Sequence, residues 1–377
     1  MINAYIIIAI GVNLFLFAFK FKNSKRVALL MVVYLFIIYT FCNGGSPDLS
    51  NYIMRYNDQV YGTAIGFDLL MQLFSFLGIG FVAFKAVIGS VFLIILYKTI
   101  SRCTKNVAMV LALFSIFPFL SSVAQIRNGL MAIIILYSLV VFIQDPKHDS
   151  IRYTIGVLIA SLIHPTALFY LIFLISKKTN RLKVNTKVFL FLLFIASVVY
   201  IFVSNMLFDI VSDFVGNEKY LSYFDFMNMI KEVTPEVLNW KGKLLPMIGQ
   251  LSGYVGLYFI LSSYKGKLSN KLNRYSINHS YQFNLEQLDM INTMFLLTFL
   301  LLPFYLISPT YFRIFKNIIP LLYIVDAQYL DFNELDYDNA HVKFKHYYII
   351  LYAIMVEIIT AYGIGYALET LDSFSLL

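Results

Sequence analysis

Residues 20–41 read KFKNSKRVALLMVVYLFIIYTF, a short basic cluster followed by a run without a charged residue from Val27 to Phe41. Apolar side chains cover all faces of this run, and the runs 5–19 and 188–203 have the same character. Lipid offers the backbone no hydrogen-bond partners, so a segment that crosses a bilayer must be a helix or part of a closed barrel. Barrel strands alternate apolar and polar side chains, and these runs do not. The sequence therefore predicts transmembrane helices.

The composition of the whole chain agrees with this prediction. Hydrophobic residues make up 60% of the 377 residues and charged residues 13%, whereas a soluble domain has about 45–50% and about 25%. We predict an all-α polytopic integral membrane protein that forms one transmembrane domain over 1–377 in the lipid bilayer. A span needs about 20 apolar residues, and about ten segments qualify: 2–19, 27–43, 81–97, 106–122, 127–143, 187–206, 244–263, 289–307, 314–330 and 347–367.

The formal net charge of +8 first suggests a nucleic-acid binder. The basic residues instead cluster in short loops, as cytoplasmic loops of membrane proteins do, so we expect no nucleic-acid partner. We predict a multi-pass protein of the bacterial inner or plasma membrane, with both termini outside and long outer loops at 43–80 and 207–243. Six loops hold 20 of the 29 Lys and Arg residues and are assigned to the cytoplasm: 20–26, 98–105, 144–152, 177–187, 264–288 and 331–346.

The apolar stretch 153–176 is too short for two full passes, and His164-Pro165 interrupts it. Proline removes a helix donor and restricts the residue before it. A single crossing would place the basic loop 177–187 outside and invert every later segment. We therefore predict a re-entrant helical pair that is broken near His164, with a single crossing as the alternative. Irregular backbone at that depth is tolerated only against protein or a wet cavity.

A first polar cluster follows the second predicted span. Asp48, Tyr52 and Tyr56 have the spacing i, i+4 and i+8, which places them on one face of a helix, and Arg55 lies beside them. The carboxylate could accept a sugar hydroxyl or act as a base, and the tyrosines and Arg55 could hold sugars. The alternative is an interfacial helix with an acidic first turn and an aromatic belt.

Two arginines, Arg127 and Arg313, lie in short turns on the predicted outer side. Arginine binds phosphate through two parallel hydrogen bonds and keeps its charge when partly dehydrated. Both could instead be anchors that extend to the membrane surface, as we predict for Lys85. Polar residues surround the two arginines beyond what an anchor needs, and we include them as substrate-binding candidates: Gln125, Asn128, Tyr311 and Lys316.

His164, at the break of the helical pair, is the remaining catalytic candidate, because an imidazole can transfer protons near pH 7. A hydrogen-bonded structural histidine is the alternative. No residues near His164 have metal-ligand spacing, so we predict no metal. The chain also lacks a Walker loop, a G-x-G-x-x-G motif and an H-E-x-x-H motif.

Taken together, these motifs resemble the EpsG-like branch of the Wzy-type polysaccharide polymerases over about 43–325. The chain departs from the pattern at Asn128, where Gln or a small residue is expected, and at Phe315-Lys316, which replaces a tyrosine. The motifs that carry the resemblance are Asp48-x3-Tyr52-x3-Tyr56, Gln125-Ile126-Arg127-Asn128-Gly129-Leu130, Ala160-x3-His164-Pro165-Thr166-Ala167-Leu168 and Tyr311-Phe312-Arg313.

The resemblance implies a glycosyltransferase that joins oligosaccharide repeat units carried on undecaprenyl diphosphate into an exopolysaccharide, capsule or O-antigen. Arg127 and Arg313 would bind the diphosphate, and Asp48 or His164 would orient or deprotonate the acceptor hydroxyl. Tyr52, Tyr56 and the aromatic residues of 207–243 would hold sugars. The resemblance implies no cofactor, and it suggests a chain-length regulator and a flippase of the same pathway as further partners.

Three other functions fit parts of the sequence. A transporter, or flippase, of a lipid-linked anionic saccharide would also use two arginines near a wet cavity, but it predicts essential polar residues at both faces. An acyltransferase would need an acidic partner for His164, and no acidic residue follows it nearby in the sequence. A passive scaffold would not need the His-Pro break.

Overall fold

The computed structural model describes residues 2–42, 47–60, 64–146, 149–177, 195, 240–272, 283–306, 311–332 and 340–364. Every regular element in these ranges is a helix, and none of them is a strand. The predicted all-α fold is therefore confirmed. The predicted span 187–206, apart from residue 195, lies outside the described residues, and so does nearly all of the predicted outer loop 207–243.

The described helices, in chain order, are α1 (Ile2–Lys20), α2 (Lys25–Phe41), α3 (Pro47–Asn57), α4 (Ile65–Phe76), α5 (Phe81–Ser101), α6 (Val107–Ile116), α7 (Phe119–Ala124), α8 (Ile126–Gln144), α9 (Ser150–Ile163), the 3₁₀-helix η1 (Pro165–Ile175), α13 (Trp240–Leu272), α14 (Leu285–Leu297), the 3₁₀-helix η3 (Thr298–Leu306), α15 (Phe312–Lys316), α16 (Ile319–Phe332) and α17 (Ala340–Ile364).

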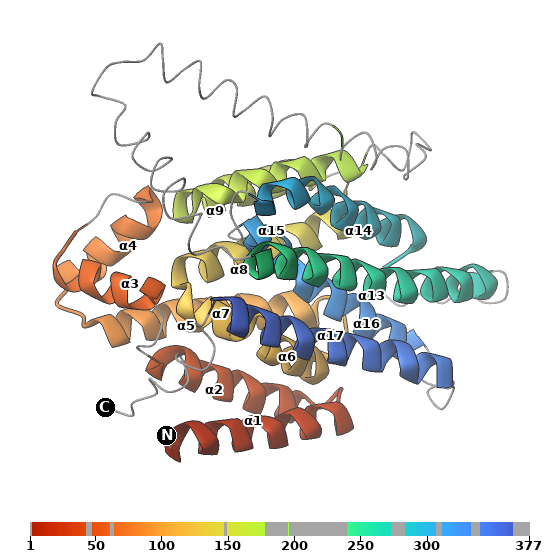
Figure 1. The fold of residues 1–377 in the computed structure, drawn as a ribbon, viewed down its shortest axis with the longest axis horizontal. Coiled ribbons are helices and arrows are strands. Elements are labelled where there is room, and N and C mark those ends of the chain that lie inside the picture. The colour runs from red at the N-terminus through yellow and green to blue at the C-terminus, as the bar shows by residue number, and fades with distance from the viewer. Residues whose placement is uncertain are drawn as a thin grey trace, which may run out of the picture.

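The long helices run nearly side by side along the longest axis of the molecule (Figure 1). α1 and α2 lie along one side, α9 and α14 lie along the opposite side, and α5, α6 and α8 lie between them. α8 packs on α5 and α9, and α13 packs on α17. α6 is buried on all faces from Val107 to Phe114, and so is α16 from Ile319 to Leu330. These two helices form the centre of the bundle.

In the part of the chain that the structure describes, four helices are long and apolar enough to cross a membrane: Phe81–Ser101, Ile126–Gln144, Leu245–Gly266 and Leu285–Leu302. They correspond to four of the ten predicted spans. The other described spans appear as helices that are shorter, broken or described only in part. Length and composition therefore identify four spans, and the predicted total of about ten is not confirmed.

Two predicted spans are interrupted. The span 106–122 breaks after α6, where Phe117 has extended backbone with φ −147° and ψ 133° before Pro118. Proline cannot donate a hydrogen bond and disfavours helical backbone at the residue before it, which explains the break. The span 314–330 breaks after Lys316, between α15 and α16. Both interruptions lie beside the polar site described below.

The chain reverses direction at His164. α9 ends there because His164 has extended backbone before Pro165, and η1 then runs back along α9. The Tyr153 hydroxyl donates a hydrogen bond of 2.7 Å to the Tyr170 carbonyl, and Lys177 Nζ lies 3.0 Å from Ser150 Oγ. The two arms of the predicted helical pair are thus antiparallel, with His164 at the tip.

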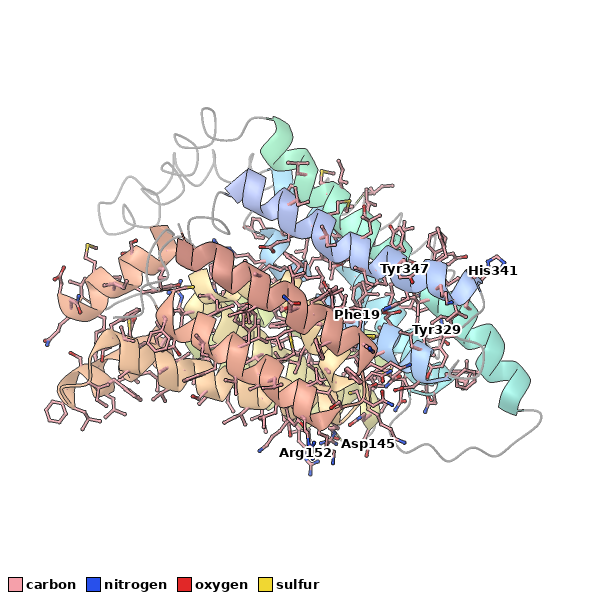
Figure 2. All side chains as sticks on the ribbon, turned by 90° about the horizontal axis from the view of Figure 1, so that it is seen from below. Phe19, Asp145, Arg152, Tyr329, His341 and Tyr347 are labelled. Carbon is pink, nitrogen blue, oxygen red and sulfur yellow. The ribbon has the colours of Figure 1, made fainter. Side chains whose placement is uncertain are left out.

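The loops assigned to the cytoplasm meet one another at one end of the bundle. Thr104 donates a hydrogen bond of 2.8 Å to Asp331, and Gln287 donates one of 3.1 Å to the carbonyl of Gln144. Figure 2 shows Arg152 and His341 in the same half of the molecule. This clustering agrees with the predicted assignment of these loops to one side. Which side faces the cytoplasm stays a prediction.

The segment 43–80 contains two helices, α3 and α4. α4 packs against α9, and a Cβ atom at Gly66 would lie 2.9 Å from the Leu162 carbonyl oxygen, so only glycine allows this close approach. The opposite side of α4 is apolar and exposed, with Ile65 75% and Phe76 86% exposed. An apolar helix face that no described residue covers suits contact with lipid.

The prediction that Lys85 extends to the membrane surface is wrong. Its side chain is fully buried. Its Nζ donates a hydrogen bond to the carbonyl of Cys42, the residue that follows α2. A cation near the carbonyl end of a helix satisfies a free acceptor and interacts favourably with the helix dipole.

Candidate functional site

A half-buried ion pair joins two distant parts of the chain. Asp48 lies in the first turn of α3, and its Oδ2 is 3.5 Å from Nη2 of Arg313 on α15. The two side chains are 33% and 30% exposed. Both charged groups therefore remain accessible to a ligand.

Arg127 lies in the first turn of α8, directly after the break between α7 and α8. Its Nε and Nη1 are buried and make no hydrogen bond with any residue that the structure describes. Buried donors are nearly always paired, so two unsatisfied guanidinium N–H groups suggest a site for an acceptor. The N-terminus of α8 adds a partial positive charge that also favours an anion there.

Tyr52 and His164 lie within electrostatic range of both arginines. Tyr52 follows Asp48 by one helical turn, and its ring contacts Phe67 edge-on at 5.7 Å. His164 comes from the tip of the helical pair. The structure therefore brings together all four predicted catalytic residues and Tyr52, from four segments of the chain.

The hydrogen bonds of His164 define its role more closely. The backbone N–H of Thr166 donates to His164 Nδ1 at 3.3 Å, and Thr166 Oγ1 is 2.8 Å from the same atom. A ring nitrogen that accepts a hydrogen bond carries no proton, so the proton of the neutral imidazole lies on Nε2. His164 can then donate a hydrogen bond to a ligand oxygen, which favours Asp48 over His164 as the base.

A buried polar layer supports the two arginines. Lys316 Nζ donates to Ser121 Oγ at 2.8 Å and to Gln125 Oε1 at 3.2 Å. The side-chain amides of Asn128 and Asn317 pair at 3.3 Å in both directions. Gln125, Asn128 and Lys316 are each at most 3% exposed. These three predicted substrate-binding residues thus have partners inside the protein, and we interpret them as residues that hold Arg127 and Arg313 in position.

The same layer connects to the helical pair. Asn317 Nδ2 donates to the Tyr170 hydroxyl at 3.0 Å, and that hydroxyl donates to the carbonyl of Ile314 at 3.1 Å. Gly129 allows α7 and α8 to approach, because a Cβ atom there would lie 3.0 Å from the Ser122 carbonyl oxygen. These contacts connect η1 to α15 and α7 to α8.

Arg55 and Tyr56 differ from their predicted role. Arg55 is 3.7 Å from Asp68 on α4 and donates to the Val60 carbonyl at 3.1 Å. The Tyr56 hydroxyl donates to the Ile79 carbonyl at 2.6 Å. Both side chains are under 10% exposed. Their polar groups hold α3 against its neighbours, and their role in holding a sugar stays a prediction.

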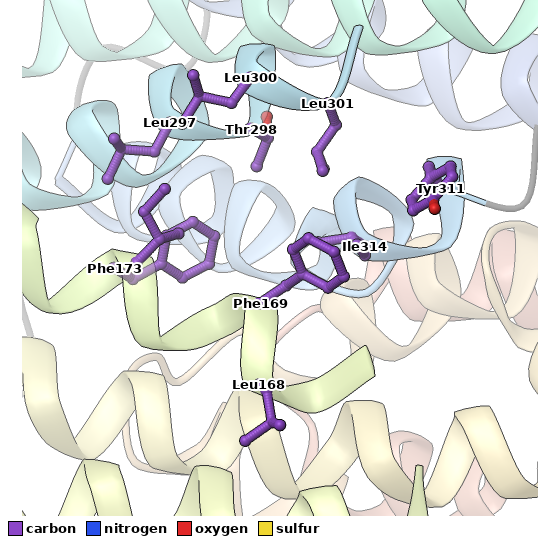
Figure 3. A pocket seen from close by; sticks show the side chains of 10 residues that line it. Leu168, Phe169, Phe173, Leu297, Thr298, Leu300, Leu301, Tyr311 and Ile314 are labelled. Atoms are coloured by element: carbon purple, nitrogen blue, oxygen red, sulfur yellow. The ribbon is translucent and has the colours of Figure 1, made fainter. Parts of the chain in front are cut away.

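The predicted substrate residue Tyr311 lies at the end of an apolar groove between η1 and η3 (Figure 3). Its ring contacts Phe169 of η1 edge-on at 6.3 Å. No three His, Cys, Asp or Glu residues of the described ranges form a possible metal site. The described site therefore offers arginines, a carboxylate and an imidazole, with an apolar groove beside them.

A model of the EpsG family matches residues 25–368. The chain belongs to the EpsG family. The match covers nearly the whole chain and confirms the resemblance to the EpsG-like polysaccharide polymerases that the motifs predicted. It also agrees with a multi-pass membrane protein. Searches of the curated proteins and of the solved structures found no match.

The structure adds a residue to this EpsG family site that the sequence analysis missed. Glu357 of α17 lies within electrostatic range of the buried Lys316, and its Oε2 is buried. The signal was present in the sequence, because Glu357 is the only charged residue of the predicted span 347–367. An ionisable residue inside a span is a functional candidate by default. Asn317 and Tyr170 were also missed, and only their tertiary contacts identify them.

Proposed function

We propose that this chain polymerises undecaprenyl-diphosphate-linked oligosaccharide repeat units into a surface polysaccharide on the outer face of the bacterial membrane. One observation carries the proposal: two arginines lie beside an accessible carboxylate and an apolar groove, and no described residue pairs with Nε and Nη1 of one of them, Arg127. This combination suits a lipid-linked anionic substrate. Membership of the EpsG family supports the same reaction class.

The proposed reaction transfers the growing glycan from its lipid diphosphate to a sugar hydroxyl of the next repeat unit. The acceptor oxygen bonds to the anomeric carbon, and the bond from that carbon to the diphosphate oxygen breaks. Asp48 takes the hydroxyl proton as a general base. The electron pair leaves with the diphosphate, where Arg127 and Arg313 stabilise the developing negative charge.

The neighbouring residues would position the reacting groups. His164 would donate from Nε2 to a phosphate or sugar oxygen, and Tyr52 would contact the sugar. Gln125, Asn128, Lys316 and Glu357 would act indirectly, by holding the arginines. The proposal includes no nucleotide sugar, metal or other cofactor. A flippase and a chain-length regulator of the same pathway remain its proposed partners.

A flippase of a lipid-linked saccharide is the second candidate, and one observation favours it. Asp326 and His346 form a buried pair in the half of the bundle that holds the basic loops, with 2.7 Å between Oδ2 and Nδ1 and side-chain exposures of 0% and 2%. Essential polar groups in both halves are what a transporter requires. The polymerase proposal predicts that Asp326→Asn leaves the linkage reaction intact.

The test is made in cells that lack the chromosomal gene and carry a plasmid copy. Arg127→Ala should stop polymer growth at normal protein level, and single repeat units should accumulate on the lipid carrier at the outer face. Arg152→Ala is the matched control, because Arg152 is 77% exposed and pairs with Asp149 in the opposite half. Long polymer from Arg127→Ala refutes the proposed role, and repeat units trapped at the inner face indicate a flippase.

A further inference from the structure

The apolar groove between the two 3₁₀-helices has a volume of about 470 Å³. Figure 3 shows side chains of η1 and of the α14–η3 segment facing one another across it. Among the described residues that line it, only Thr298 and Tyr311 have polar side-chain groups, which are hydroxyls. Its lining residues are Leu168, Phe169, Ile172, Phe173, Leu297, Thr298, Leu300, Leu301, Tyr311 and Ile314.

The 3₁₀ geometry of the walls gives the groove a straight apolar lining. Side chains at i and i+3 of a 3₁₀-helix lie directly above one another. Phe169 and Ile172 have this spacing on η1, and Thr298 and Leu301 have it on η3. Each pair forms a ridge parallel to its helix axis. Runs of 3₁₀-helix longer than three or four residues are uncommon, and here η1 has 11 residues and η3 has 9.

One end of the groove meets the charged site. Tyr311 and Ile314 line the groove, and Arg313 lies between them on α15. The wall formed by η1 is partly open, because Leu168 is 47% and Phe169 is 43% exposed. Arg313 does not itself line the groove. A ligand that fills the groove and extends past Tyr311 and Ile314 to Arg313 would be apolar along its length and anionic at one end. That charge distribution matches a polyprenyl diphosphate.

We propose that this groove binds the isoprene units nearest the diphosphate of the lipid-linked substrate. This inference rests on the proposed function and assigns a place to one part of its substrate. The groove has the size of a small-ligand pocket, so it holds the start of the polyprenyl chain and leaves the rest in the bilayer. A prenyl chain gains little by moving from lipid to an equally apolar wall. The main effect of the groove is therefore to orient the diphosphate against Arg313. Its contribution to the affinity for the lipid-linked substrate is small.

The variant Leu168→Trp fills the groove from its open side, where a larger side chain does not disturb the buried core. Leu158→Trp is the matched control, because Leu158 lies on the other arm of the helical pair, is 49% exposed and does not line the groove. The two purified proteins are compared in lipid nanodiscs with repeat units on undecaprenyl diphosphate and on a diphosphate with a single isoprene unit.

We expect Leu168→Trp to lower the turnover number with the undecaprenyl substrate by about tenfold or more, because small displacements of a reacting group are costly. Turnover with the single-isoprene substrate should change far less, and Leu158→Trp should match the wild type. Equal rates for the two variants on the undecaprenyl substrate overturn the groove assignment and leave the proposed function intact. No polymer from the wild type with either substrate overturns the proposed function instead.

Cross-linking identifies the occupant independently of activity. A photoreactive undecaprenyl diphosphate should label residues 165–175 and 297–301, and unlabelled undecaprenyl diphosphate should compete whereas phosphatidylglycerol should not. Equal competition by phosphatidylglycerol identifies a general lipid groove and refutes the inference. Labelling confined to other helices refutes it as well.

Discussion

Replacing Arg313 by alanine should separate a chemical role of this residue from a structural one. Its partner Asp48 lies 3.5 Å away, and both side chains are about one third exposed. Exposed ion pairs contribute only about 0.2–1 kcal/mol to stability, because water screens the charges and both side chains lose freedom. A loss of this size should lower the melting temperature by at most about 3 °C.

The expected loss of activity is much larger. Removing a donor that stabilises developing negative charge in a transition state costs about 2.7–4 kcal/mol, or about 10²–10³ in rate. Arg313→Ala should therefore reduce polymer formation by about that factor while the protein unfolds at nearly the same temperature. The substitution must leave Asp48 in place, so that only the cation is removed.

The assay measures the initial rate of polymer formation by purified protein in nanodiscs, with a thermal unfolding scan of the same samples. Arg152→Ala, at the other end of the molecule, controls for the loss of an exposed arginine. A rate within tenfold of the wild type at an unchanged melting temperature refutes the role in leaving-group stabilisation. A fall of more than 10 °C in the melting temperature refutes the claim that the ion pair between Asp48 and Arg313 contributes little to the stability of the protein.

Three further predictions follow from the same contacts. Asp48→Asn should lower the rate about 10²–10⁴-fold, as expected for loss of a general base, and binding of undecaprenyl diphosphate measured by photolabelling should not weaken. Arg55→Ala should destabilise the protein by about 3–5 kcal/mol, because it leaves the buried Asp68 without its ion-pair partner; an unchanged unfolding midpoint contradicts this. Lys316→Met should destabilise more alone than in combination with Glu357→Gln, and a double-mutant cycle should give a coupling energy of about 0.5–3 kcal/mol; strictly additive effects mean that the two residues do not interact.

Sequence patterns predicted most members of the site but not their roles. The spacing of Asp48, Tyr52 and Tyr56 places them on a shared side of α3, yet eight residues correspond to a rotation of about 80°. That rotation is enough to turn Tyr56 onto Phe84 of α5, where the rings stack at 5.2 Å, while Asp48 meets Arg313. Periodicity indicates which residues lie on a common face, and it does not indicate which neighbour covers each of them.

Polar residues inside apolar runs were a reliable signal of the site but an incomplete one. Arg127 and His164 were found because they interrupt apolar sequence, and the same rule would have found Glu357. This rule could not distinguish a polar residue that contacts a ligand from one that is hydrogen-bonded inside the protein. Gln125 and Asn128 flank Arg127 in the sequence, and only the structure shows that their side chains make buried hydrogen bonds with Lys316 and Asn317.

The sequence by itself determined the helical class of this protein and the reversal at His164. Apolar runs in lipid must satisfy their own backbone, and proline restricts its predecessor wherever it occurs. The tertiary structure alone decided that Asp48 meets Arg313, 265 positions later in the chain, and that two 3₁₀-helices enclose a groove beside them. Backbone hydrogen bonding is local and leaves a pattern in the sequence, whereas packing between distant helices depends on how their side chains fit, which no local pattern records.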